Sequence, residues 1–366
     1  MSKRLRICHL TSVHLDGDIR IFHKMARSMA TDFEVHVVVP NTETRMQDGV
    51  QIHSFTAQTQ NRRIRMKHTV DEVLEVALRI SADIYQLHDP ELLRIAPKLK
   101  RQGAKVVFDS HEDVPKQIMD KFWIPWTLRK LISFAYKQYE KRHVKKLDGI
   151  ISVTPSICTR FAKSHQKVAL VRNFPILSEF PTPQWQQKNI KNICYIGGLY
   201  ESRGIREVVL AMEKVDAQLH LAGTFDDPSL LAELECTNAW KKVRFHGQVG
   251  RTEIQDILSK CTIGLVTLHP TPSYKEAYPI KMFEYLAAGC AVVASDFPLY
   301  KSLLFGSQCA HFVDPQDTSE IARVLQELIA DPQQTLAMAK AARSCFEQKY
   351  SWENEVKTLH EFYLSL

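Results

Sequence analysis

The chain alternates between short apolar runs and longer stretches in which apolar residues recur at helical spacing. The apolar runs predict strands at 5–10, 33–39, 84–87, 105–109, 149–153 and 168–171, and again at 192–196, 218–222, 243–246, 262–268, 291–294 and 311–313. Many of these runs are rich in Val and Ile without clean alternation, which is typical of parallel strands covered on both faces. Strands and helices that alternate at this spacing predict a doubly wound α/β fold.

A polar stretch with three prolines, at residues 173–188, interrupts this alternation. Because proline cannot donate to a sheet ladder, the stretch is predicted to be a linker rather than a central strand. We therefore predict two Rossmann-like domains, at 1–172 and 191–349, joined by a linker at 173–190. The two domains are expected to face each other across a cleft that the carboxyl ends of their strands line.

The composition is that of a folded protein without a membrane span. Of the 366 residues, 45% are hydrophobic and 24% are charged, and no run of about 18 apolar residues occurs. A cleaved signal peptide is not expected, because the basic N-terminus leads directly into a strand. The eight cysteines are scattered without a C-x-x-C pair, so we expect reduced core residues in a cytoplasmic protein and no metal site built on them.

The net charge of +7 is concentrated in two places, one at 62–67 and the other at 121–147. The second segment holds eight Lys or Arg residues against the single acid Glu140, and it begins with aromatic residues around Pro125. This composition predicts a helix on an anionic membrane surface. The alternative is a helix that packs on the sheet and leaves its lysines in water. No motif for binding nucleic acid is present.

The segment at 275–296 places two carboxylates around the start of a predicted helix. Pro279 suits a first helical turn, and Gly289 suits the end of a helix over 280–288. Its apolar face is expected to be Ile280, Phe283 and Ala287. Glu276 then lies on the loop before the helix and Glu284 one turn inside it. The N–H groups at a helix start bind anions, and carboxylates accept hydrogen bonds from sugar hydroxyls. The alternative is two solvated surface acids.

Glu276-x7-Glu284 followed by Tyr-Leu-Ala-Ala-Gly-Cys-Ala-Val-Val-Ala-Ser resembles the E-x7-E signature of retaining GT-B glycosyltransferases, specifically family 4. The resemblance extends to both halves of the chain. It includes His-Leu-Thr-Ser-Val-His at 9–14, Leu-His-Asp-Pro at 87–90, Asp-Ser-His-Glu-Asp at 109–113, Ile-Gly-Gly-Leu at 196–199 and Phe-His-Gly at 245–247. It also implies that the C-terminal helix, at 350–366, crosses back onto the first domain.

The resemblance assigns donor-binding roles in the second domain. Glu276 would contact the transferred sugar and Glu284 the ribose of the nucleotide, while the main-chain amides of Ala277 and Tyr278 would approach the diphosphate or the sugar. The family commonly has an Arg directly after the Gly of the first loop and a Lys a few residues later.

In this chain those two positions hold Gly198 and Arg203. We therefore expect Arg203 to be the phosphate clamp, which a planar guanidinium suits. Arg206 would share this role or be a solvated cation. The base would be bound mostly by main chain near Gln248.

In the first domain the resemblance places His88 beside the anomeric carbon of the donor, as a catalytic residue. His111 and, less directly, His14 would shape the acceptor pocket. Gly17 would let the backbone approach phosphate, or it would form a plain turn.

The resemblance implies an enzyme that needs neither a metal nor a cofactor. Asp226 and Asp227 are expected to form a loop turn or a helix start rather than a metal site. The reaction would move a hexosyl group from a UDP- or GDP-sugar to a hydroxyl of a saccharide, with retention. If the basic segment binds a membrane, the acceptor is lipid-linked and serves bacterial surface polysaccharide assembly. Another GT-B enzyme, such as a nucleotide-sugar epimerase, and a non-catalytic binding protein remain open.

Overall fold

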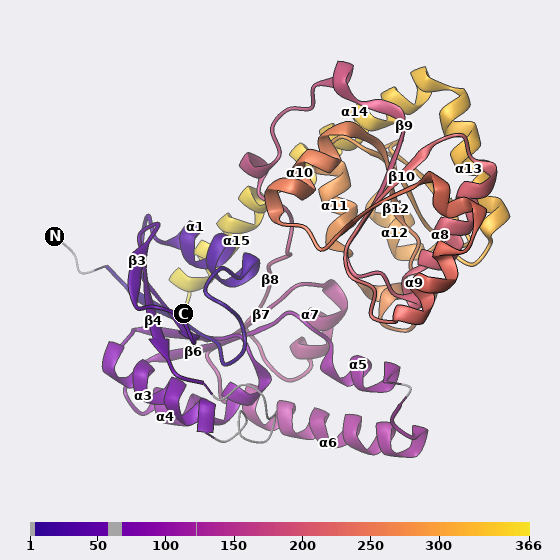
Figure 1. Cartoon of the computed structure of the whole chain (residues 1–366). Helices are drawn as coiled ribbons and strands as arrows, with labels where there is room; N and C mark the ends of the chain where they lie inside the picture. Colours follow the sequence, from indigo (N-terminus) through magenta and orange to yellow (C-terminus); the bar gives the residue numbers. More distant parts are fainter. Residues whose placement is uncertain (1–3, 58–67, 122) are drawn as a thin grey trace. The chain divides into compact units, whose positions relative to one another are not determined.

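The computed structural model describes residues 4–57, 68–121 and 123–366 (Figure 1). The predicted basic cluster at 62–67 lies outside the described residues. The chain divides into two compact units. Unit 1 consists of Met1–Asn173 with Trp352–Leu366, and unit 2 consists of Phe174–Ser351.

Unit 1 is built on an eight-stranded sheet with the strand order β3-β4-β2-β1-β5-β6-β7-β8. The strands are β1 (Arg6–Leu10), β2 (Glu34–Pro40), β3 (Arg45–Gln47), β4 (Val50–Phe55), β5 (Ile84–Leu87), β6 (Lys105–Ser110), β7 (Gly149–Ser152) and β8 (Val168–Leu170). All neighbours are parallel except β3 and β4. The helical elements are η1 (Ile19–Ala26), α1 (Arg27–Met29), α3 (Val70–Ile80), η3 (Pro90–Arg94), α4 (Ala96–Lys100), α5 (Val114–Asp120), α6 (Trp126–Val144), α7 (Pro155–Ala162) and α15 (Trp352–Leu364).

The edge strand β3 and its neighbour β4 were not predicted. They form a hairpin in which Asp48 and Gly49 both have positive φ, at 50° and 80°, as a tight two-residue turn requires. The sequence of β4, Val-Gln-Ile-His-Ser-Phe, alternates between apolar and polar residues. A search for continuous apolar runs therefore passes over it.

Unit 2 is built on a six-stranded parallel sheet with the order β11-β10-β9-β12-β13-β14. The strands are β9 (Asn189–Ile196), β10 (Gln218–Ala222), β11 (Val243–Gly247), β12 (Cys261–Val266), β13 (Ala291–Ser295) and β14 (Ala310–Val313). The helices are α8 (Ile205–Ala211), α9 (Pro228–Glu235), α10 (Arg251–Lys260), α11 (Ile280–Ala287), α12 (Pro298–Leu303), α13 (Thr318–Ala330) and α14 (Pro332–Lys349).

Two apolar clusters cover the two faces of this sheet. One packs α10, α11, α12 and α14 on the strands, and the other packs α8, α9 and α13. Counted from β9, the strand order is that of a Rossmann fold, in which the order reverses between the first strand and the fourth, here β9 and β12. The predicted doubly wound α/β fold and all twelve predicted strands are confirmed.

The two units are not simply divided by a linker that lies outside both of them. Most of the proline-bearing stretch belongs to unit 2, where Phe174 and Phe180 are buried in the core. Helix α15 belongs to unit 1, where Trp352 Nε1 donates to Ser28 Oγ at 2.9 Å and Glu355 accepts from the backbone N–H of Arg172 at 2.7 Å.

All eight cysteines are free, and six of them are buried as predicted, but Cys236 is exposed and Cys158 is only partly buried. No helix in the described part of the chain combines the length and the apolar character needed to cross a bilayer. Within the same residues, no group of three His, Cys, Asp or Glu side chains is arranged to hold a metal ion.

Candidate functional site

Helix α11 is fixed at both ends and tied to the centre of the unit 2 sheet. It begins after Pro279 and ends in a Schellman motif, in which Gly289 N–H donates to Leu286 O at 3.0 Å and Cys290 N–H donates to Tyr285 O at 2.8 Å. The hydroxyl of Tyr285 accepts from the backbone N–H of Ile196, the last residue of β9, at 2.9 Å. Tyr285, in the later part of α11, therefore ties this helix to the carboxyl end of β9.

Several predicted donor-binding residues gather where β9 and β12 end. The loop after β9 carries Gly197, Gly198 and, in η6 (Glu201–Arg203), Arg203. The segment after β12 carries η9 (Tyr274–Glu276) and the start of α11. Ligands of doubly wound folds bind outside the carboxyl ends of the strands where the strand order reverses. We call this region, with Gly197, Gly198, Arg203, Glu276 and Glu284, the β9/β12 site.

Glu276 is exposed at the last position of η9, and Ala277, Tyr278 and Pro279 separate it from α11. Ala277 N–H already donates to Tyr274 O, at 3.3 Å, so its predicted approach to a ligand would require that bond to be shared. The Tyr278 ring stacks on Phe283 at 6.1 Å between centroids. The predicted apolar face of α11 is wrong at one position, since Ile280 is 41% exposed whereas the neighbouring Lys281 is buried.

Glu284 is half-buried and makes an ion pair with Arg251, the first residue of α10. The same guanidinium binds Glu179 at 2.6 Å. The sequence pattern does not predict this arrangement, because Arg251 and Glu284 are 33 residues apart and meet only in the folded unit. Arg251 therefore joins the candidate residues. The predicted ribose contact of Glu284 requires its bond with Arg251 to be shared or released.

Arg203 lies near the end of β9, in the loop that follows this strand. Its guanidinium lies 4.7 Å from the centre of the Tyr200 ring, and its Nε donates to the Tyr274 hydroxyl at 3.4 Å. Tyr200 also explains Gly198: a Cβ at this position would lie 2.7 Å from Cζ of Tyr200. The ring fills the space that a longer side chain would need.

Arg206 and Gln248 lie less favourably for a donor role. Arg206 is paired with both Glu233 and Glu201, which agrees with the alternative of a surface cation. Gln248 is exposed directly after β11. The predicted helix start at Asp227 is confirmed, because its carboxylate accepts from Ser229 N–H at 2.8 Å and caps α9.

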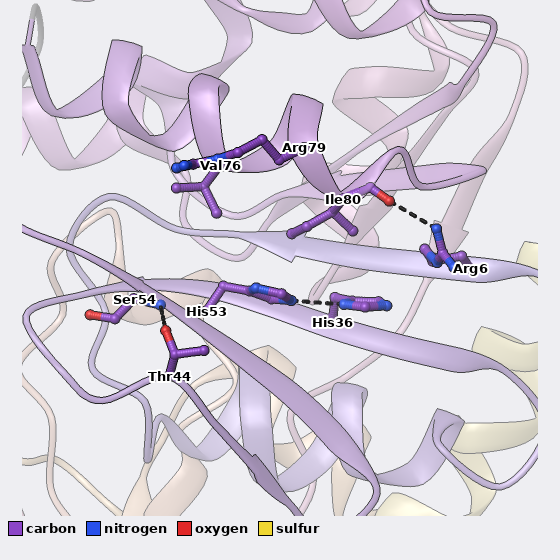
Figure 2. Close-up of a pocket in the computed structure, with 8 residues that line it drawn as sticks. All are labelled: Arg6, His36, Thr44, His53, Ser54, Val76, Arg79 and Ile80. Carbon is purple, nitrogen blue, oxygen red and sulfur yellow. Dashed lines mark hydrogen bonds between the residues drawn. The ribbon is translucent and has the colours of Figure 1, made fainter.

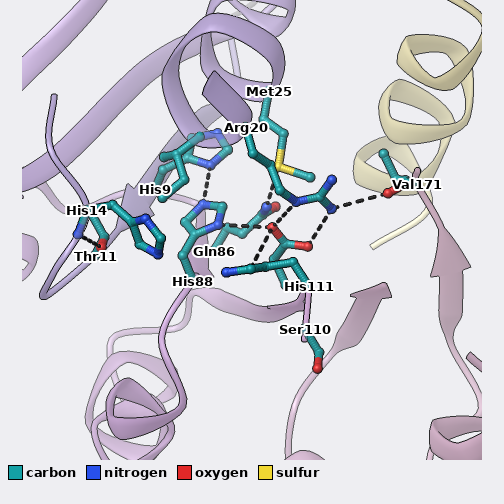
Figure 3. A network of polar contacts seen from close by, with 12 residues as sticks. His9, Thr11, His14, Arg20, Met25, Gln86, His88, Ser110, His111 and Val171 are labelled. Carbon is teal, nitrogen blue, oxygen red and sulfur yellow. Dashed lines mark hydrogen bonds and ion pairs between the residues drawn. The ribbon is translucent and has the colours of Figure 1, made fainter. Parts of the chain in front are cut away.

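A buried polar network occupies the corresponding edge of the unit 1 sheet (Figure 3). His88 follows β5, and its Nδ1 lies 3.0 Å from Asp109 Oδ2 while its Nε2 lies 2.9 Å from His9 Nδ1. Arg20 Nε and Nη2 donate to the Asp109 carboxylate at 2.9 and 2.7 Å. We call His9, His88, Asp109 and Arg20 the histidine network. All four side chains are buried.

The network carries one charge pair and two histidines. Burial alone would raise the pKa of Asp109, but the Arg20 charge and the hydrogen bonds from His88 and Arg20 hold this pKa well below its usual value. Burial, reinforced by His88, lowers the pKa of His9. Both ring nitrogens of His88 are engaged. A direct contact between His88 and a donor sugar would therefore need one of these bonds to open, which the sequence analysis did not anticipate.

His14 and His111 lie beside this network, with ring centroids 5.6 Å apart. Hydrogen bonds to Asp18, at 3.1 Å, and to Asp89 raise the pKa of His14 to about 10. His14 is consequently a partly exposed cation at neutral pH. Burial lowers the pKa of His111. Gly17 is exposed in a turn, and a Cβ at this position would have open space around it, with no atom within 4 Å.

A separate hollow in unit 1 lies near the start of β1 and the end of α3 (Figure 2). Its histidines contact each other, with His36 Nδ1 2.8 Å from His53 Nε2. Arg6 is held by Glu34 and by the carbonyl of Ile80, and Arg79 lies near Glu75. Since these cations are already paired, we do not include the hollow in the candidate site.

Two family models match the chain, one in each half. "Glycosyltransferase Family 4" matches residues 19–174, and "Glycosyl transferases group 1" matches residues 181–345. The chain belongs to the family 4-type GT-B glycosyltransferases.

Individual curated proteins resemble the chain over limited lengths. D-inositol 3-phosphate glycosyltransferase of Corynebacterium urealyticum is 35% identical over 26% of this chain and 22% of its own. N,N'-diacetylbacillosaminyl-diphospho-undecaprenol alpha-1,3-N-acetylgalactosaminyltransferase of Campylobacter jejuni is 26% identical over 48% of this chain and 46% of its own. The chain thus spans less than half the length of these two relatives.

A solved structure shows that the GT-B fold is shared over the whole chain. HepE of Anabaena, in complex with UDP-glucose, superimposes with a TM-score of 0.72 at 15% identity. The match covers 99% of this chain and 100% of HepE.

Proposed function

We propose that this GT-B glycosyltransferase moves a hexosyl group, with retention, from a UDP- or GDP-sugar to a hydroxyl of a lipid-linked saccharide in bacterial surface polysaccharide assembly. The observation that carries the proposal is the β9/β12 site itself. Glu276 and Glu284 flank the first turn of α11, and Arg203 lies in the loop after the adjacent β9. Two carboxylates and a cation around a helix start match the hydroxyls and the diphosphate of a nucleotide sugar.

Each group has a defined task in this proposal. Glu276 accepts hydrogen bonds from hydroxyls of the transferred sugar, and Glu284 accepts from the ribose diol. Arg203 binds the diphosphate and stabilises the negative charge that grows as the nucleoside diphosphate leaves. No step requires a metal or a cofactor.

We propose same-face attack as the route to retention. The bond between the anomeric carbon and the phosphate oxygen breaks, and the acceptor oxygen bonds to the same face of the oxocarbenium-like centre. The acceptor proton passes to an oxygen of the departing phosphate. The histidine network and His14 lie at the matching edge of the unit 1 sheet, and we assign His88, His111 and His14 to the sugar and acceptor side.

Names of related proteins support the substrate classes. HepE was solved with UDP-glucose, and the Campylobacter relative is named for an undecaprenol-linked acceptor. They support a nucleotide-sugar donor and a lipid-linked acceptor for this chain.

A panel of UDP- and GDP-sugars tests the proposal. Each sugar is incubated with the protein, with and without short-chain lipid-linked saccharides, and free nucleoside diphosphate and glycosylated acceptor are measured. We expect one donor to give acceptor-dependent release and a product with the anomeric configuration of the donor. An epimerised donor without transfer would favour the epimerase alternative, and binding without turnover would favour a non-catalytic protein.

The surface of α6 supports the lipid-linked acceptor. Among the residues of α6 only Ser133, Glu140 and Val144 are buried. The exposed large apolar side chains, which we call the α6 surface, are Trp126, Leu128, Leu131, Ile132 and Phe134, each at least 44% exposed. A hollow along the later turns is lined by Lys141, Arg142, Lys145 and Lys146. Exposed apolar side chains on the first turns, followed by cations along the later turns, fit an anionic lipid surface.

We expect the double variant Trp126→Ser, Leu131→Ser to bind vesicles of anionic phospholipid at least about 10-fold more weakly than the native protein, because each buried apolar side chain contributes roughly 1.5–3 kcal/mol. Co-sedimentation with vesicles measures this. Phe305→Ser is the matched control, since Phe305 is 83% exposed and belongs to unit 2. Equal binding of both variants, or self-association that involves α6, would contradict the membrane proposal.

A further inference from the structure

Lys281 is a buried cation without a hydrogen-bond partner. It is the second residue of α11 and is 9% exposed. In the described part of the chain, its Nζ donates to no hydrogen-bond acceptor and no carboxylate lies within ion-pair distance of it. Its Nζ lies over the ring of Tyr195, 3.7 Å from the centroid. A cation–π contact of this kind replaces only part of the lost hydration.

Lys281 and Arg203 converge on the same point. A Cβ built on Gly197 would lie 3.6 Å from Arg203 Nη1, 3.7 Å from Lys281 Cε and 3.8 Å from Lys281 Nζ. Gly197 has a φ of 116°, a conformation that favours glycine. The loop after β9 therefore passes two cationic side chains at close range. No described acidic side chain forms an ion pair with either of them.

Two neighbouring cations with no counter-charge disfavour each other in the unliganded protein. Burial, followed by the charge of Arg203, lowers the pKa of Lys281 well below its usual value. The Glu284 carboxylate acts in the opposite direction, but it is bound by Arg251. An anion that binds between Lys281 and Arg203 would relieve the burial of an ammonium without an acceptor and the repulsion between the two cations. It supplies both the missing acceptor and the missing negative charge.

We propose that Lys281 is a second phosphate-binding cation of the β9/β12 site, and that it grips the diphosphate of the donor together with Arg203. This inference rests on the proposed function, because it takes the anion to be the diphosphate of a nucleotide sugar. A diphosphate has several anionic oxygens on two phosphorus atoms, so it can satisfy two cations at once. Lys281 also lies in the first turn of α11, where backbone N–H groups favour an anion.

The proposed role of Lys281 explains how positive charge can reach the diphosphate although Gly198 stands where the family commonly has an Arg. The Tyr200 ring fills the space beside Gly198, so positive charge does not come from that position. Lys281 supplies positive charge instead, from the start of α11. Lys281 lies between the two glutamates of the E-x7-E signature, but the sequence analysis gave it no role because the helical pattern did not predict its burial.

Isothermal titration tests the proposal with nucleotides alone. The nucleoside diphosphate that binds better, UDP or GDP, is titrated together with the corresponding mononucleotide and nucleoside. The proteins compared are the native protein, Lys281→Met, Lys281→Gln and the control Lys241→Met. Lys241 is an exposed lysine of unit 2 whose Nζ donates to Asn238 Oδ1 at 3.1 Å. We expect both Lys281 variants to bind the diphosphate about 10- to 100-fold more weakly, which corresponds to one charged hydrogen bond. The loss of affinity for the nucleoside, which has no phosphate, should be much smaller.

The melting temperature of the unliganded protein separates a ligand role from a structural one. Removal of a buried ammonium without a partner should leave the melting temperature of Lys281→Met unchanged or raise it. Native-like diphosphate binding by both variants would overturn the proposal, as would equal losses for nucleoside and diphosphate together with a lower melting temperature. If the native protein binds neither UDP nor GDP, the proposed function fails instead.

Discussion

Replacement of Glu276 by Gln is expected to lower the rate of donor turnover by about 10²- to 10³-fold. The change keeps the size of the side chain but removes the charge that strengthens its hydrogen bonds to sugar hydroxyls, and such electrostatic contacts carry effects of this size when they tighten in the transition state. Nucleoside diphosphate release, followed at saturating donor, gives kcat. We expect most of the loss in kcat rather than in KM.

Glu213→Gln is the matched control for this experiment. Glu213 is an exposed glutamate of unit 2 at the end of the α8 segment, and no role in the β9/β12 site is assigned to it. Its variant should turn over the donor at the native rate. If Glu276→Gln also turned over the donor within about 3-fold of the native rate, the assignment of Glu276 to the transferred sugar would be wrong.

Removal of Asp109 is expected to destabilise unit 1 by about 3–5 kcal/mol, because it leaves the buried Arg20 guanidinium without its partner. The pair is bidentate, with side chains 6% and 0% exposed. Asp109→Ala should therefore lower the urea concentration at the unfolding midpoint strongly. A circular-dichroism titration with urea measures this change for the whole chain.

Two further variants show whether the effect arises from the uncompensated charge. Glu75→Ala removes an exposed partner of Arg79 in the same unit, at 3.9 Å, and should change stability by less than about 1 kcal/mol. The double variant Arg20→Met, Asp109→Ala removes both charges and should recover part of the lost stability. Equal midpoints for Asp109→Ala and Glu75→Ala would contradict the interpretation of the histidine network.

The fold could be predicted largely from the chain because buried parallel strands leave continuous apolar runs. Strands such as β12 and β13 are buried at every residue. The hairpin of β3 and β4 was missed for the opposite reason. It lies at the edge of the sheet, where alternation and the Asp48–Gly49 turn carry the information.

The candidate site was predictable to the extent that its residues are close in sequence. Glu276, Pro279 and Gly289 define α11 and its ends locally. The bond between Glu284 and Arg251 was not predictable, since it depends on how α10 packs next to α11 in the folded unit. The same holds for His88, whose two ring nitrogens are engaged by residues 79 and 21 positions away.

A crystal structure of the native protein with its bound nucleoside diphosphate tests the central claim most directly. The account predicts the diphosphate at the β9/β12 site, in contact with Arg203 and the first turn of α11, and the ribose hydroxyls within hydrogen-bond distance of Glu284. A nucleotide bound elsewhere, or a Glu284 carboxylate that contacts only Arg251 in the presence of nucleotide, would contradict it.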